Sequence, residues 1–192
     1  MMIGLYRPMV MALGVAALAA VATLPSPVLA ASADEIDRGV NAALRNLYAS
    51  QPSARVLAAK AKAVLVFPTI VKAGFMFGGQ IGEGAMRKGD LLRGGRTTGY
   101  YNSVAASYGL QAGVQTFSYA LFFMNDGALA ALDNTAGFEL GVGPSIVLVD
   151  QGLAKSMTTA TLTQDVYAFI FGQKGLMAGL GIQGSKITRL DK

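Results

Sequence analysis

The stretch Gly74-Phe75-Met76-Phe77-Gly78 places two glycines four residues apart inside an apolar, strand-like segment. The same spacing returns in Gly109-Leu110-Gln111-Ala112-Gly113 and in Gly175-Leu176-Met177-Ala178-Gly179. Side chains of a strand alternate between its faces, so glycines at positions i and i+4 share one face. Interior glycine weakens a strand unless another backbone or a ligand must approach closely there. The pattern predicts a tightly curved antiparallel β-structure whose chains come close together at Gly74, Gly109 and Gly175.

The segments around these repeats continue the β-pattern. The apolar run Ala63–Phe67 predicts a buried strand that ends at Pro68. A short helix rich in Ala and Leu is expected at 126–133, and the basic segment 87–96 is typical of a hairpin loop. Further strands are expected at 73–86, 97–107, 109–118, 119–124, 137–149, 157–171 and 175–189.

Two helices are expected before the first strand. Ser32 and Glu35 form a capping-box pattern that predicts a helix over 32–50. Pro52 ends it, and a second helix is expected from Ser53 to about Lys62. One face of the first helix carries an apolar stripe at helical spacing, made of Ile36, Val40, Leu44 and Leu47. The fold class is therefore α+β: N-terminal helices packed on a curved, glycine-rich antiparallel β-sheet or partial barrel.

Residues 1–30 have the features of a secretory signal peptide. Arg7 supplies the positive end, Met9–Leu24 the apolar core, and Pro25-Ser26-Pro27 breaks that core before small residues. Cleavage is expected after Ala30 or after Ala33, because the core is shorter than the ~20 residues of a permanent span. We expect a periplasmic or secreted protein with a single domain over 31–192.

The composition excludes much catalytic chemistry. The chain has no cysteine and no histidine, which removes most zinc sites, cysteine nucleophiles and histidine acid–base pairs. We expect no enzyme activity, no cofactor and no metal. The remaining enzyme alternative needs carboxylates that converge in space, such as Glu83, Asp90 and Glu139.

The net charge of +5 favours anionic partners. For an exported chain these are lipid headgroups rather than nucleic acid. The apolar stripe of helix 35–48 has two possible roles: it could lie in a headgroup layer, or it could pack on the sheet, as the apolar faces of amphipathic helices usually do. The electrostatic contribution is expected from Lys60, Lys62, Lys72, Arg87, Lys88, Arg93 and Arg96.

Several motifs together resemble one family. Lys62-Ala63-Val64-Leu65-Val66-Phe67-Pro68, Lys72-Ala73-Gly74-Phe75 and Gly82-Glu83-Gly84 are similar to the opening of the SYLF domain. Gly109–Gly113 is similar to its central glycine–glutamine motif. Val166-Tyr167-Ala168-Phe169, Lys174–Gly179 and Gly184-Ser185 are similar to its closing strands. The resemblance covers roughly residues 35–190.

The resemblance implies a non-catalytic, lipid-binding domain. Eukaryotic members bind phosphoinositide membranes, partly through an N-terminal amphipathic helix, and a yeast branch binds actin filaments. For an exported, bacterial-type member we expect binding of anionic phospholipid at a membrane surface with peripheral association, and actin is not an expected partner. One alternative is an eight-stranded outer-membrane β-barrel or a structural envelope protein, and the oligomeric state is open.

Overall fold

The computed structural model describes residues 30–133, 138–139, 144–150, 154, 162–175 and 186–192. The chain divides into two units, Met1–Ala30 and Ala31–Lys192, and only the second is described below. The predicted signal segment and the second glycine of the third repeat, Gly179, lie outside the described residues.

Helix α1 (Ala33–Ser50) begins where the sequence predicts, whereas helix α2 (Pro52–Ala58) begins at Pro52, with Gln51 and not the predicted Ser53 at its N-cap. The Ser32–Glu35 capping box of α1 is formed. Helix α2 is shorter than the predicted helix to Lys62. It ends early because the N–H of Lys62 already pairs with the carbonyl of Phe123, 2.8 Å away, at the edge of the sheet.

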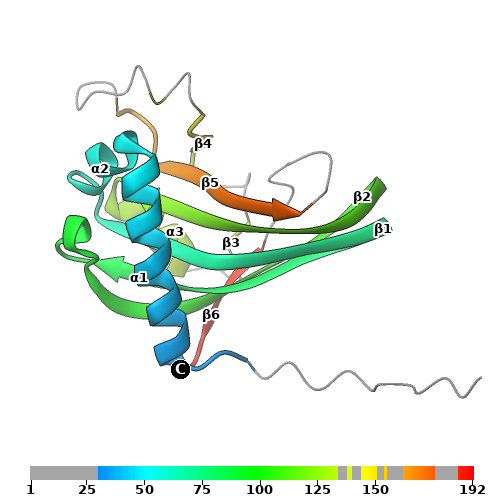
Figure 1. Cartoon of the computed structure of the whole chain (residues 1–192). Coiled ribbons are helices and arrows are strands. Elements are labelled where there is room, and N and C mark those ends of the chain that lie inside the picture. The colour runs from blue at the N-terminus through cyan, green and yellow to red at the C-terminus, as the bar shows by residue number, and fades with distance from the viewer. Residues whose placement is uncertain (1–29, 134–137, 140–143, 151–153, 155–161, 176–185) are drawn as a thin grey trace, which may run out of the picture. The chain divides into compact units, whose positions relative to one another are not determined.

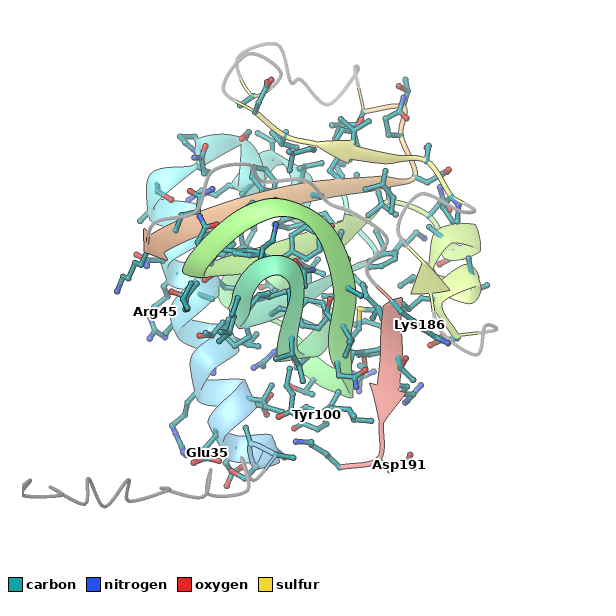
Figure 2. All side chains as sticks on the ribbon, turned by 90° about the vertical axis from the view of Figure 1, so that its right-hand side faces the viewer. Glu35, Arg45, Tyr100, Lys186 and Asp191 are labelled. Atoms are coloured by element: carbon teal, nitrogen blue, oxygen red, sulfur yellow. The ribbon has the colours of Figure 1, made fainter. Side chains whose placement is uncertain are left out.

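Two long strands form most of the sheet. Strand β1 (Ala63–Lys88) and strand β2 (Arg96–Phe123) pair as one antiparallel hairpin, joined through the short 3-10 helix η1 (Leu91–Arg93). The sequence predicts two separate strands within 63–86 and three within 97–124, and these breaks are wrong. Pro68 does not end the first strand, because a register shift between Phe67 and Ile70 accommodates it as a bulge. In Figure 2 both strands bend back on themselves as two nested arches.

Within the described residues, the remaining elements extend this hairpin into a six-stranded sheet. Helix α3 (Asp126–Asp133) has the predicted bounds. The other strands are β3 (Phe138–Glu139), β4 (Ile146–Leu148), β5 (Val166–Gly175) and β6 (Lys186–Leu190). The order is β3-β6-β2-β5-β4, with β1 paired to β2.

The predicted fold class is confirmed, with one correction to strand direction. The N-terminal helices pack on a curved sheet (Figure 1), but β4 pairs with β5 in parallel. The long connection between them, 149–165, allows this, since a parallel pair needs a crossover of roughly a dozen residues or more. None of the described helices has both the length and the apolarity needed to cross a bilayer.

The hydrophobic core occupies both faces of the sheet. The apolar stripe of α1 packs against Val64, Val66 and Phe122 on one face. Leu65, Phe67 and Leu121 point to the other face and form a second cluster. Every residue of Ala63–Phe67 is fully buried, as the continuous apolar run predicts.

The closest backbone approaches fall at glycines, only partly at the predicted ones. A Cβ on Gly84 would lie 2.2 Å from the carbonyl oxygen of Val66, so the two ends of β1 pack directly on each other. A Cβ on Gly175 would lie 2.3 Å from the carbonyl oxygen of Val114, as the repeat predicts. Gly74 pairs with Gly113 across the hairpin, and the crowding predicted at Gly109 stays a prediction.

Candidate functional site

The predicted lipid-binding stripe of α1 lies in the core. Ile36, Val40, Leu44 and Leu47 are at most 3% exposed, and they pack on the sheet. Packing on the sheet is one of the two arrangements that the sequence left open, and the one that amphipathic helices usually adopt. Membrane contact through these four side chains would therefore require α1 to leave the sheet.

The predicted basic residues fall into two groups. Lys72 and Arg87 are buried, each about 6% exposed. The others reach the surface, with Lys88 half-buried and Lys62 paired to Asp126 at 3.6 Å. The exposed members are Lys60, Lys62, Arg93 and Arg96.

Arg87 belongs to a polar network beneath α1. Its Nη2 donates to Asp37 Oδ1 at 3.2 Å and to the Asp37 carbonyl at the same distance. Thr97 Oγ1 donates to Oδ1 at 2.8 Å, and the Tyr100 hydroxyl donates to Oδ2 at 3.2 Å. Burial and the neighbouring Asp37 carboxylate raise the pKa of Tyr100. One helix carboxylate thus joins both strands of the hairpin, and Arg87 has a structural role.

A basic cleft of about 360 Å³ opens between α1 and η1. Arg45 approaches it from α1, and Arg93, whose side chain is 88% exposed, approaches it from η1. Leu92, also exposed, supplies an apolar edge. The full lining is Asn41, Leu44, Arg45, Tyr48, Leu92, Arg93 and Gly94.

Local contacts hold η1 beside α1. The Tyr48 hydroxyl donates to the Leu91 carbonyl at 3.0 Å, and burial raises the pKa of Tyr48 to about 12. Asp90 caps η1 by accepting from the Arg93 N–H at 3.3 Å, and its carboxylate lies 3.6 Å from Arg93 Nε. Gly94, with φ 97°, reverses the chain in a conformation that glycine adopts at little cost. The cleft walls are therefore set by hydrogen bonds rather than by the basic side chains themselves.

Sequence reasoning found Arg93 but missed Arg45 and Asn41. Both lie on the polar side of α1, and their spacing of one helical turn is the signal that could have grouped them. The sequence around these residues does not show that η1 folds back against this turn of α1.

A second exposed surface is apolar. Ile81 on β1 and Val104 on β2 are cross-strand partners, 59% and 44% exposed. Lys186 on β6 is the next partner of Val104 (labelled in Figure 2). Val71 and Val114 are also exposed.

The carboxylates of the enzyme alternative have separate partners. Glu83 Oε1 lies 3.2 Å from Lys192 Nζ, and Asp90 caps η1. The side chain of Glu139 lies outside the described residues. Within the described ranges, no three His, Cys, Asp or Glu side chains come together in a way that could hold a metal ion.

Comparison with known protein families gives a match in the second half of the chain. Residues 104–192 match the model of the Ysc84 family, described as "Las17-binding protein actin regulator". The match begins within β2 and includes the central and closing motifs quoted above, Gly109–Gly113, Val166–Phe169, Lys174–Gly179 and Gly184-Ser185. No curated protein matches the chain. The family description concerns binding and regulation rather than catalysis. Residues 104–192 therefore match the Ysc84 (SYLF) family, which confirms the resemblance for the motifs inside that range, whereas the motifs at 62–84 lie outside it.

Proposed function

We propose that this protein binds anionic phospholipid at a membrane surface through the cleft between α1 and η1, and performs no chemistry. The observation that carries the proposal is the approach of two arginines, Arg45 and Arg93, to one surface cleft beside the exposed Leu92. Guanidinium groups bind phosphate oxygens through paired hydrogen bonds. Leu92 can then contact the apolar layer beneath the headgroups.

The surrounding charges support an anionic surface as the ligand. Lys88 and Arg96 are cross-strand partners at the base of the same hairpin connection. A basic residue near an anionic membrane contributes roughly 1 kcal/mol. Asp90, which pairs with Arg93, offsets part of this attraction. The attraction should weaken with salt, because exposed charges are screened beyond ~8 Å at physiological ionic strength.

Vesicle sedimentation tests the proposal directly. The purified protein should sediment with vesicles containing phosphatidylserine, more weakly with pure phosphatidylcholine vesicles, and less as salt is added. The double variant Arg45→Gln/Arg93→Gln should bind phosphatidylserine vesicles about thirtyfold more weakly, since two charges near the surface, worth roughly 1 kcal/mol each, are lost. Its melting temperature should be unchanged.

A matched control separates a specific cleft from general charge. Arg38→Gln/Lys60→Gln removes two exposed cations that do not line the cleft, so its binding should stay close to that of the unmodified protein. If both double variants lost vesicle binding equally, the binding would depend on overall positive charge and not on the cleft. Equal binding to neutral and anionic vesicles, or wild-type binding by the Arg45/Arg93 variant, would overturn the proposal.

The family description favours a protein partner as the second candidate. "Las17-binding protein actin regulator" names a binding protein and actin. Sedimentation with filamentous actin in the absence of vesicles distinguishes the two functions. We expect no actin binding, because the sequence predicts an exported, periplasmic or secreted chain. Binding to actin without binding to vesicles would favour the second candidate.

A further inference from the structure

We infer that the chain is cut between Ala30 and Ala31, and that the new α-amino group of Ala31 then forms an ion pair with Glu83 that fastens the first residue of the domain to its last. The inference rests on the predicted signal peptide and is independent of lipid binding.

Three segments far apart in sequence meet at Glu83. The backbone nitrogen of Ala31 donates to Glu83 Oε2 at 2.9 Å. Lys192 Nζ lies 3.2 Å from each carboxylate oxygen of Glu83, and it also donates to the Ala31 carbonyl. The side chains of Glu83 and Lys192 are 22% and 14% exposed, so water reaches this group only in part.

Cleavage changes the chemistry at the Ala31 nitrogen. Hydrolysis of the Ala30–Ala31 peptide bond adds one water, leaving a carboxylate on Ala30 and an amine on Ala31. An α-amino group has an ordinary pKa of about 7.7–8.0, so the amine is mostly protonated at neutral pH. A neutral amide donor becomes an ammonium beside a carboxylate, so a charge–charge attraction is added to the existing hydrogen bond.

The other predicted cleavage point, after Ala33, would remove contacts that the domain uses. Ser32 caps α1: its N–H donates to Glu35 Oε2 at 2.8 Å, and its Oγ accepts from the Glu35 N–H at 3.3 Å. Loss of such a cap destabilises the helix that it begins. The same cut would also remove Ala31 and its bond to Glu83. Ala30, by contrast, is exposed and precedes every one of these contacts.

Mass spectrometry of the protein exported by its producing cells tests the cleavage site. A mature chain that begins at Ala31 is expected. A chain that begins at Asp34, or one that retains Met1, would overturn the assignment. Neither result depends on whether the protein sediments with vesicles, so this inference and the proposed function can fail separately.

A comparison of the precursor with the mature protein tests the ion pair. Glu83→Gln should lower the melting temperature of both, because Lys192 loses its partner in each. The drop should be about 2–4 °C larger in the mature protein, where the ammonium also loses its partner. Asp90→Asn, which is remote from Ala31, should lower both by the same amount. An equal drop for Glu83→Gln in precursor and mature protein would show that the new amine does not pair with Glu83.

Discussion

The guanidinium of Arg87 lies 3.2 Å from the carboxylate of Asp37 and joins the end of β1 to the first half of α1. The Arg87 side chain is only 7% exposed, whereas Arg93, six residues later, is almost fully exposed. The basic segment 87–96 therefore combines two functions that its composition alone does not separate. Its first residue stabilises the fold, and its later residues are available to a ligand.

Removing Asp37 should destabilise the protein. Asp37→Ala leaves the Arg87 guanidinium buried without its carboxylate, and it also takes an acceptor from Thr97 and Tyr100. Breaking a buried ion pair from one side costs roughly 3–5 kcal/mol, and the partial exposure of Asp37 places the expected loss near the lower end, about 3 kcal/mol. Urea unfolding measures it. Asp34→Ala, an exposed position on the same helix, should change stability by about 1 kcal/mol at most.

Arg87 and Arg93 should respond differently to the same substitution. Arg87→Gln should lower the melting temperature, because it breaks the bond to Asp37. Arg93→Gln should leave the melting temperature unchanged and weaken sedimentation with phosphatidylserine vesicles about fivefold, the value of roughly 1 kcal/mol at a charged surface. Calorimetry measures the melting temperature of each variant, and sedimentation measures its binding to vesicles. Weaker binding of a fully folded Arg87→Gln protein would place Arg87 at the binding surface after all.

The sequence predicts local structure well here and long-range structure only in part. Helices α1 and α3 follow from a capping box and from a run of helix formers, signals that lie within the elements themselves. The bulge that carries β1 past Pro68, and the parallel pairing of β4 with β5, depend on partners elsewhere in the chain. The same holds for the site. Fifty residues separate Arg87 from Asp37, so local charge patterning could not distinguish this buried cation from the exposed ones.

Gly84 should tolerate an added side chain poorly. A Cβ there would lie 2.2 Å from the Val66 carbonyl oxygen and 2.8 Å from the Phe67 ring, so the two ends of β1 would have to move apart. Gly84→Ala should therefore cost about 1–3 kcal/mol, as overpacking does. The control is Gly127→Ala in α3, where the nearest atom to the new Cβ is 3.4 Å away. That change should be neutral or slightly stabilising, because alanine favours helix. Equal melting temperatures for the two variants would contradict the close packing of β1.

Stability should fall at alkaline pH partly because of Tyr48. Burial raises the pKa of Tyr48 from its ordinary value of 10.0 to about 12, although Arg55 opposes the shift. Between these two values the unfolded chain releases the phenol proton while the folded protein keeps it. The unfolded state then binds fewer protons, so the free energy of unfolding decreases as pH rises through this window, and the stabilisation is fully present below pH 10.

Tyr48→Phe removes this contribution, and at neutral pH it also loses the hydrogen bond to Leu91, worth about 1 kcal/mol. Urea unfolding at a series of pH values should therefore show a variant that is less stable at pH 7 but loses less stability above pH 10. The variant should still lose some stability with rising pH, because burial also raises the pKa of Tyr101 and Tyr119. Identical slopes for the variant and the unmodified protein would mean that Tyr48 ionises in the folded state as freely as in the unfolded chain, and η1 would then not be held closed over its hydroxyl.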